Sequence, residues 1–202
     1  MTEAYFVFLN AVGLIAFSFS GAIKGIIKEL DLFGIILLGI VTALGGGAIR
    51  DIMVQKTPVM LTAPSYVLLS LVGVIAAISV KGKRNIAVYT KIFLISDAIG
   101  LASFTSTGSI IAYQSGLGMI GMIVLGMSTA IGGGIIRDIL ANEVPMVLNK
   151  EIYATCSLAG CIVFWACYRI CDINLTSFFS MATVFVLRML AIRYRWNLPK
   201  FS

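Results

Sequence analysis

Histidine is absent from the 202 residues, and charged residues make up only 12% of them. Without histidine the chain lacks the commonest general base and proton relay, and a zinc site built from cysteine and histidine is excluded. The four cysteines form no CxxC pair and fall in or near one apolar segment, where we assign them to packing. We therefore predict that the protein is not an enzyme and holds no cofactor or resident metal ion.

Apolar residues dominate what is present, since 59% of the chain is hydrophobic and its mean hydropathy is +1.02. An apolar helix of about 20 residues crosses the hydrocarbon core of a bilayer. Seven such runs predict an all-α integral membrane protein with seven transmembrane helices in a single transmembrane domain, residues 1–202. The expected spans are Tyr5 to Ile23, Leu32 to Val54, Tyr66 to Val80, Ile92 to Ile111, Gly118 to Leu140, Ile152 to Ile170 and Leu175 to Ile192, with the third starting near Leu61.

The first run has Glu3 and no basic residue ahead of it, which favours a retained helix over a cleaved signal peptide. With seven spans, twelve of the 15 basic residues fall on one side of the membrane, and the positive-inside rule places that side in the cytoplasm. We predict an inner (plasma) membrane protein with its N-terminus outside and its C-terminus cytoplasmic. The net charge of +6 then reflects this bias and attraction to anionic membrane lipids, and we expect no nucleic-acid partner. The twelve are Lys24, Lys28, Lys81, Lys83, Arg84, Lys91, Arg137, Lys150, Arg188, Arg193, Arg195 and Lys200; the other three are Arg50, Lys56 and Arg169.

An internal repeat organises the chain. The segment TALGGGAIRDIM, which starts at Thr42, returns as TAIGGGIIRDIL at Thr129, 87 positions later. Each copy contains three spans, and because three is odd the second copy enters the membrane from the opposite face. We predict inverted three-helix repeats at about residues 4–82 and 91–170, with a seventh helix outside the symmetry at about 174–192. The same ungapped offset aligns Gly13 with Gly100, Phe17 with Phe104 and Pro58 with Pro145.

Each copy carries a glycine triplet in its second helix. Glycine weakens a helix by roughly 1 kcal/mol relative to alanine and permits torsions that kink or unwind it. Matched interruptions of this kind in inverted repeats are typical of transport pathways near the membrane midplane. Close packing of two helices is the other interpretation. The triplets are Gly45, Gly46 and Gly47, and Gly132, Gly133 and Gly134.

An arginine and an aspartate follow each triplet, Arg50 with Asp51 and Arg137 with Asp138. Sequence neighbours do not face each other on a helix. By the pseudo-symmetry, we expect Arg50 to approach Asp138. The equivalent pair is then Arg137 with Asp51, unless each arginine caps carbonyls freed in the opposite helix. Snorkelling of both arginines to the membrane surface is the alternative.

Further polar residues lie in the first helix of each copy. Asp97 and its repeat partner Asn10 come near the start of that helix, where pathway lining and solvation at the membrane interface both stay open. Hydroxyl groups also match between the copies, and they either line a pathway or bond carbonyls of their own helix. These hydroxyls belong to Ser18, Ser20, Thr105 and Thr107.

Two copies of GGGxIRDI, each followed six residues later by proline, resemble the prokaryotic members of the trimeric intracellular cation (TRIC) channel family. The resemblance covers nearly the whole chain. It implies a seven-helix protomer, a homotrimer with one pore in each protomer, and passage of monovalent cations such as K⁺. It also implies that the second and fifth helices are kinked at the triplets and line the pore. Related bacterial two-repeat proteins are described as glycine transporters, so the resemblance leaves channel and carrier open.

The two functions use the same residues differently. In a channel, carbonyls and hydroxyls partly replace the hydration shell of K⁺, and pairing of each arginine with a carboxylate removes its repulsion. In a carrier for glycine or another small zwitterion, arginine binds the carboxylate, aspartate binds the ammonium, and the repeats rock for alternating access. We favour a passive channel for monovalent cations, with the glycines, charged pairs and hydroxyls above along the ion pathway.

Overall fold

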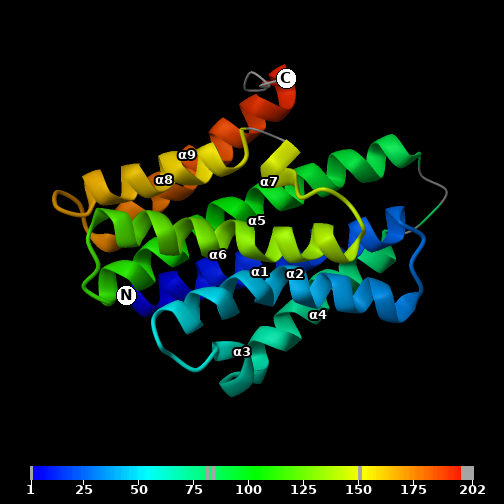
Figure 1. Cartoon of the computed structure of the whole chain (residues 1–202), viewed down its shortest axis with the longest axis horizontal. Coiled ribbons are helices and arrows are strands. Elements are labelled where there is room, and N and C mark those ends of the chain that lie inside the picture. The colour runs from blue at the N-terminus through cyan, green and yellow to red at the C-terminus, as the bar shows by residue number, and fades with distance from the viewer. Residues whose placement is uncertain (1, 81, 83–84, 150–151, 197–202) are drawn as a thin grey trace.

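The computed structural model describes residues 2–80, 82, 85–149 and 152–196. Within these residues the chain folds into nine helices, most of which run along the long axis of the molecule in Figure 1. The predicted all-α class is therefore confirmed. In chain order the helices are α1 (Thr2–Ile27), α2 (Leu32–Met53), α3 (Val59–Thr62), α4 (Pro64–Ser79), α5 (Ile86–Gln114), α6 (Met119–Leu140), α7 (Met146–Asn149), α8 (Ala154–Cys167) and α9 (Ile173–Tyr194).

Seven of these helices occupy the seven expected spans. Five of them, α1, α2, α5, α6 and α9, are long and apolar enough to cross a membrane, whereas α4 and α8 are shorter apolar helices. The expected start of the third span near Leu61 is wrong, because Leu61 lies in the short helix α3 and α4 begins at Pro64. A residue before proline avoids the helical region, and Ala63 is accordingly extended at φ −123° and ψ 95°.

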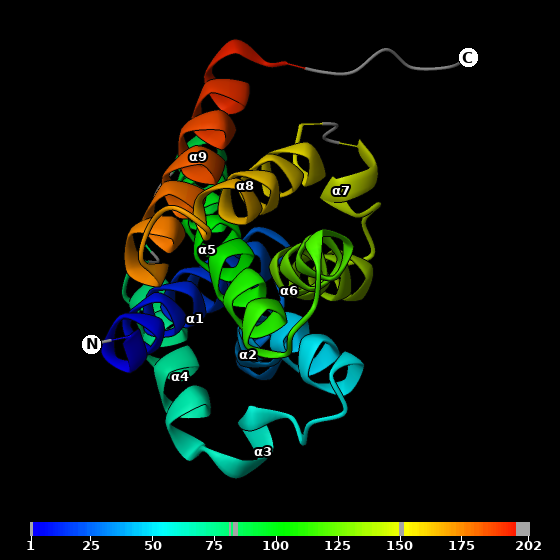
Figure 2. The same ribbon diagram turned by 90° about the vertical axis from the view of Figure 1, so that its left-hand side faces the viewer.

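The two repeats form equivalent three-helix units. Helix α1 packs on α2 and α4, and α5 packs on α6 and α8. The units meet where α1 contacts α5 and α2 contacts α6, at the centre of the end-on view in Figure 2, with α4 and α8 on opposite sides. Helix α9 has no counterpart and packs chiefly on α5 and α8.

Reciprocal contacts reveal how the units are related. Phe17 of α1 packs edge-on against Phe104 of α5, its counterpart in the repeat, with ring centroids 5.2 Å apart. A Cβ atom at Gly13 would collide with the Phe104 ring, and one at Gly100 would collide with the Phe17 ring. Contacts that recur with the two partners exchanged are the mark of a two-fold axis. The predicted pseudo-two-fold relation is thus present in the fold.

The second helix of each unit also ends in the same way. Gln55 after α2 and Asn142 after α6 have positive φ angles of 55° and 54°. The next N–H group, that of Lys56 or Glu143, bonds back into the helix at 2.9 Å. A left-handed residue of this kind ends a helix and turns the chain, which here directs it toward α3 and α7.

An ion pair brings the end of α1 to the end of α6. The last turn of α1 contains Lys24, and Glu143 after α6 contacts it, so these two helix ends share one side. Five of the basic residues that predict the orientation lie outside the described residues, and the orientation stays a prediction. These five are Lys81, Lys83, Arg84, Lys150 and Lys200.

Candidate functional site

Helices α2 and α6 cross at their glycine triplets. A Cβ atom at Gly46 would collide with the carbonyl oxygen of Thr129, and one at Gly133 would collide with that of Thr42. The contacts run in opposite directions along the two helices, which are therefore antiparallel at the crossing. The interpretation of the triplets as sites of close helix packing is confirmed at these two central glycines.

Both helices continue without interruption through the triplets. Helix α2 is helical over Leu32–Met53, and α6 over Met119–Leu140. The expectation that the glycines unwind the helices and free backbone carbonyls is therefore wrong. The absence of Cβ atoms lets the two backbones approach closely, while the backbone torsions of the triplets stay helical.

The outer glycines of each triplet have different neighbours. A Cβ atom at Gly45 or Gly132 would lie 2.9 Å from an isoleucine side chain of the opposite helix. A Cβ atom at Gly47 would lie 3.7 Å from Arg50 Nη2, and one at Gly134 would lie 3.4 Å from the Tyr153 hydroxyl and 3.5 Å from Arg137 Nη2. The triplets thus pack helix against helix on one face and border buried charges on the other.

Each arginine binds the aspartate beside it. Nε and Nη2 of Arg50 donate to Asp51 Oδ1 at 2.9 and 2.7 Å. Nε of Arg137 donates to Asp138 Oδ1 at 2.9 Å. The arginines are 3% and 0% exposed, so the alternative that they snorkel to the surface is wrong.

The expected cross-pairs, Arg50 with Asp138 and Arg137 with Asp51, are also wrong. Each arginine lies four residues beyond the central glycine of the crossing, which is about 6 Å along its helix. Because the two helices are antiparallel, the two arginines lie on opposite sides of the crossing. The Cβ atoms of neighbouring residues diverge on a helix, but the long arginine side chain folds back far enough to reach the adjacent carboxylate.

The second oxygen of each aspartate holds the short helix that follows. Asp51 Oδ2 accepts a hydrogen bond from Val59 N at 2.9 Å, where α3 begins. Asp138 Oδ2 accepts one from Met146 N at 2.8 Å, where α7 begins. Sequence reasoning missed this role, although the offset of 87 positions also relates Val59 to Met146.

The second cluster contains one more carboxylate than the first. Arg137 Nη1 donates to Asp97 Oδ1 at 2.5 Å, and both side chains are fully buried. Asp97 is therefore an interior residue rather than one solvated at the membrane interface. At the equivalent place in the first repeat, Asn10 Nδ2 donates to Phe6 O of its own helix at 3.1 Å. Two carboxylates and one guanidinium give the second cluster a formal charge of −1, whereas the first, with one of each, is neutral.

Uncharged groups complete the surroundings of Arg137. Its guanidinium carbon lies 4.7 Å from the centre of the Phe93 ring, a cation–π distance. Nη2 donates to Met146 Sδ at 3.7 Å, and Nη1 lies 3.4 Å from Ser20 Oγ. Contacts from α1, α5 and α7 therefore fix this arginine.

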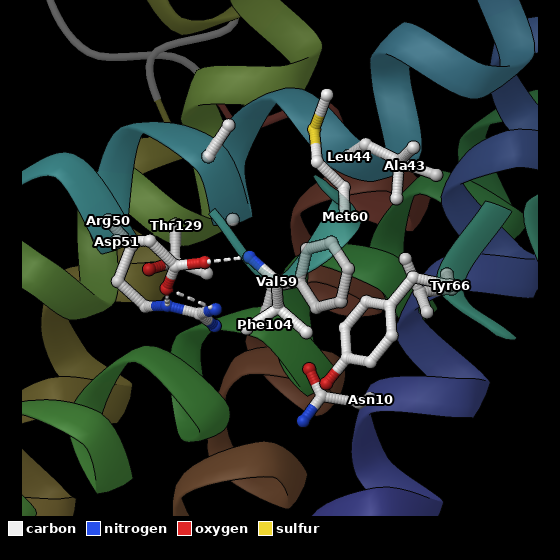
Figure 3. A pocket seen from close by; sticks show the side chains of 13 residues that line it. Asn10, Ala43, Leu44, Arg50, Asp51, Val59, Met60, Tyr66, Phe104 and Thr129 are labelled. Atoms are coloured by element: carbon white, nitrogen blue, oxygen red, sulfur yellow. Dashed lines mark hydrogen bonds and ion pairs between the residues drawn. The ribbon is translucent and has the colours of Figure 1, made fainter. Parts of the chain in front are cut away.

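A cavity of about 20 Å³ lies beside the first cluster (Figure 3). Arg50, Asp51 and Val59 lie at one end of it, and Asn10 and Tyr66 lie at the other. This space is large enough for about one water molecule. The equivalent residues of the second repeat enclose a volume of about 0 Å³, so the two copies differ in packing as well as in charge.

The four matched hydroxyls are all buried and bond mainly to their own helices. Ser18, Ser20 and Thr107 donate to carbonyls three residues earlier at 3.1, 2.9 and 3.3 Å. Thr105 donates to a carbonyl four residues earlier at 2.8 Å. The interpretation that they bond their own helices is confirmed, while their place along a pathway stays a prediction.

A third charged group, which the sequence did not predict, connects α1 to the loop after α6. Glu143 forms ion pairs with Lys24 and, at 2.7 Å, with Lys28. Burial raises the pKa of the Glu143 carboxyl, but the two ammonium groups outweigh this and hold the pKa below its ordinary value. The positions equivalent to Lys24 and Glu143 hold Ile111 and Lys56, so the repeat gives no sign of this group.

A cavity of about 310 Å³ opens beside these ion pairs. Lys24 and Glu143 line it together with Phe93 and Met146. Phe93 and Met146 also contact Arg137, so the cavity ends one layer of side chains away from the second charged cluster.

The chain matches the family described as Glycine transporter over residues 7–81 and again over 94–169, once in each repeat. The chain belongs to this family. Among its curated relatives, the UPF0126 membrane protein of Deinococcus radiodurans is 42% identical over 160 residues, which are 78% of this chain and 74% of the relative. The UPF0126 inner membrane protein YadS of Escherichia coli K12 is 35% identical over 198 residues, 96% of this chain and 95% of the relative. The present protein, as a homologue of YadS, is likewise a multi-pass inner membrane protein.

Solved structures connect this family to the TRIC channels. The crystal structure of a prokaryotic TRIC channel in 0.5 M KCl superposes with a TM-score of 0.91 at 37% identity, over 98% of this chain and 100% of the other. The TRIC trimeric intracellular cation channel orthologue from Rhodobacter sphaeroides gives a TM-score of 0.85 at 35% identity, over 95% and 98% of the two chains. The protein is therefore a homologue of prokaryotic TRIC cation channels with their seven-helix fold, and it is not an enzyme.

Proposed function

We propose that the protein is a passive channel for monovalent cations such as K⁺, with a pore in each protomer lined by α2 and α6. The observation that carries this proposal is the second charged cluster, where Asp97 and Asp138 outnumber the single Arg137. In a medium of low dielectric constant a surplus carboxylate acts strongly, lowering the energy of a cation and raising that of an anion. Homology to TRIC cation channels likewise favours cations over anions as the permeating ions.

The pathway that we propose connects the two cavities. It runs from the cavity at Lys24 and Glu143, past Phe93 and the second cluster, to the crossing of α2 and α6 and the small cavity beside Arg50. The Phe93 layer and the tight crossing close it in this structure. Because glycine tolerates a wide range of torsions, we propose that it opens when α2 and α6 kink and separate at the triplets.

Assembly and orientation belong to the same proposal. We propose a homotrimer of bundles, each with its own pore, on the basis of the trimeric channel orthologue from Rhodobacter sphaeroides. The N-terminus lies outside and the C-terminus in the cytoplasm, where the basic residues gather. Membrane lipids surround the apolar faces of the helices.

Electrical recording from purified protein in a planar bilayer tests the proposal. Ions cross a channel without a conformational cycle for each ion, so KCl alone, with no other solute, should give unitary current steps. A carrier turns over through global rearrangements in microseconds to milliseconds or longer, and its flux does not resolve into steps. Silent bilayers, together with saturable uptake of glycine into vesicles, would replace the channel with a carrier.

A carrier for glycine or another small zwitterion is the second candidate, and the description of the matching family favours it. An arginine would then bind the carboxylate of the solute and an aspartate its ammonium group. In this structure Arg50 and Arg137 already bind carboxylates, and the cavity beside Arg50 has room for only about one water molecule. Glycine binding therefore requires the charged pairs to open first.

A further inference from the structure

Three arginines are buried in the described part of the chain, and only two of them have a carboxylate partner there. The third is Arg188 on α9, which is 4% exposed. Its Nη1 donates to Ile152 O at 3.4 Å, and its Nε has no hydrogen-bond partner among the described residues. A buried charge without a counter-charge is costly in a membrane. The described residues therefore supply no counter-charge for Arg188, and an anion from elsewhere would remove this cost.

The guanidinium of Arg188 is held in place beside a second-repeat residue. Its carbon lies 4.8 Å from the centre of the ring of Tyr153, the residue that precedes α8. The aromatic face attracts the cation and orients it, but it supplies no negative charge and accepts no in-plane hydrogen bond. This contact fixes the position of Arg188 while leaving its donors in need of oxygen acceptors.

A cavity of about 300 Å³ adjoins Arg188 between α5, the start of α8 and the end of α9. Arg195 and Trp196 also line it, together with the apolar side chains of Leu94 and Ile192. No acidic side chain of the described residues lines this space. Two arginines thus border one cavity to which the described residues bring no countercharge.

The end of α9 forms the outer wall of the cavity. Arg195 has a positive φ angle of 53°, which ends the helix, and Trp196 N bonds back to Ala191 O at 3.1 Å. This turn keeps Arg195 and Trp196 next to the buried Arg188. Tryptophan is enriched at the level of lipid headgroups, and this end of α9 lies on the predicted cytoplasmic side, where the leaflet contains anionic lipids.

We propose that this cavity, which we call the headgroup site and define by Arg188, Arg195 and Trp196, binds the phosphate group of an anionic phospholipid from the predicted cytoplasmic leaflet. Phosphate oxygens accept hydrogen bonds from the two guanidinium groups, a pairing that arginine forms well. The acyl chains extend along Leu94 and Ile192, and Trp196 packs at the glycerol level. The headgroup site stands independently of ion conduction, because binding alone defines it.

Native mass spectrometry of the purified protein, titrated with phosphatidylglycerol or phosphatidylcholine, measures this binding. We expect the wild type to bind phosphatidylglycerol about tenfold more tightly than phosphatidylcholine, because two arginines contact the anionic headgroup. Arg195→Gln should weaken phosphatidylglycerol binding about fivefold, as expected for one basic residue at the membrane surface. Arg188→Gln should weaken it about tenfold or more, since a charged hydrogen bond is lost from a buried place.

Arg169→Gln is the matched control. Arg169 is also an arginine beside a tryptophan, 5.5 Å from the Trp165 ring, but it is exposed and does not line the headgroup site. Its substitution should leave the lipid preference unchanged. Circular dichroism and the Tm in detergent check folding, and if Arg188→Gln does not fold, the exposed positions Arg195 and Trp196 decide the test through Arg195→Gln and Trp196→Ala.

Three outcomes would overturn the proposal. The first is equal binding of the two lipids by the wild type. The second is an unchanged preference for phosphatidylglycerol in folded Arg195→Gln and Trp196→Ala proteins. The third concerns the source of the phosphate: if inorganic phosphate displaces phosphatidylglycerol, and Arg195→Gln weakens binding of inorganic phosphate, the site takes the free ion and the lipid assignment is wrong.

Discussion

Arg137 and Asp97, 40 positions apart on α6 and α5, form the buried ion pair that breaks the symmetry of the two repeats. Their counterparts Arg50 and Asn10 do not pair, because the Asn10 amide bonds its own helix. The two copies of one fold therefore present different charges on the two sides of the crossing, neutral beside α3 and net negative beside α7.

The pairing of each arginine with its neighbour predicts strong coupling between Arg50 and Asp51. Asp51→Asn leaves Arg50 buried without a counter-charge, so we expect it to lower the free energy of unfolding by about 3–5 kcal/mol. Arg50→Met combined with Asp51→Asn should cost clearly less than the sum of the single changes. Unfolding in detergent, followed by circular dichroism, gives these values.

The same cycle run on Arg50 and Asp138 is the control. These residues lie on opposite sides of the crossing, so the effects of Arg50→Met and Asp138→Asn should add within about 0.5 kcal/mol. Coupling in this pair, with additivity between Arg50 and Asp51, would restore the cross-pairing that the structure rules out.

The tight crossing predicts that adjacent glycines differ in their tolerance of alanine. Gly46→Ala places a Cβ atom against the Thr129 carbonyl, a backbone atom that cannot move aside, and should destabilise the fold by about 1–3 kcal/mol. Gly47→Ala meets its nearest atom, Arg50 Nη2, at 3.7 Å and gains up to about 1 kcal/mol from helix propensity. Comparison of the Tm in detergent tests this, and equal values for the two variants would contradict the crossing geometry.

The ion pairs of Glu143 predict a dependence of stability on pH. Because Lys24 and Lys28 lower the pKa of Glu143 in the folded state, the ion pairs stabilise the protein above the ordinary value of 4.5 and lose this effect as the pH falls below it. The Tm of the wild type should therefore fall between about pH 5 and pH 3 more steeply than that of Glu143→Gln. The difference will be small, since the Glu143 side chain is 38% exposed. Parallel curves would show that the pairs contribute nothing in detergent.

Much of this fold could be predicted from the internal repeat. The offset that relates Gly46 to Gly133 predicted two equivalent units, because matched glycines and prolines constrain the same helix contacts and turns in both copies. The odd number of spans in each unit predicted their inverted relation. The difference between Asn10 and Asp97 was also visible in the sequence. Its consequence was not, because the partner of Asp97 is set by how α5 packs on α6.

The errors have physical causes. The rule that neighbours on a helix diverge describes Cβ positions, and it fails for Arg50 and Asp51 because the arginine side chain is long enough to fold back. The ion pair of Lys24 with Glu143 joins residues 119 positions apart and has no counterpart in the first repeat, so neither a motif nor the symmetry indicates it. Packing alone brings these two residues together.

Assembly can be tested in lipid. Chemical crosslinking of the protein in vesicles should saturate at a trimer, as expected from the trimeric orthologue. A ladder that stops at a dimer, at protein densities low enough to prevent chance collisions, would contradict the proposed assembly.

The central claim is that a surplus buried carboxylate makes the pathway selective for cations, and the reversal potential under a KCl gradient tests it most directly. We predict that wild-type currents reverse close to the K⁺ equilibrium potential. Asp97→Asn makes the second cluster neutral like the first, and should reduce the permeability ratio of K⁺ to Cl⁻ about fivefold, on the order of 1 kcal/mol at an effective dielectric constant near that of a protein surface. Asn10→Ala, at the equivalent uncharged position, should leave the ratio unchanged. A wild-type reversal potential near that of Cl⁻, or a ratio that Asp97→Asn does not alter, would contradict the account.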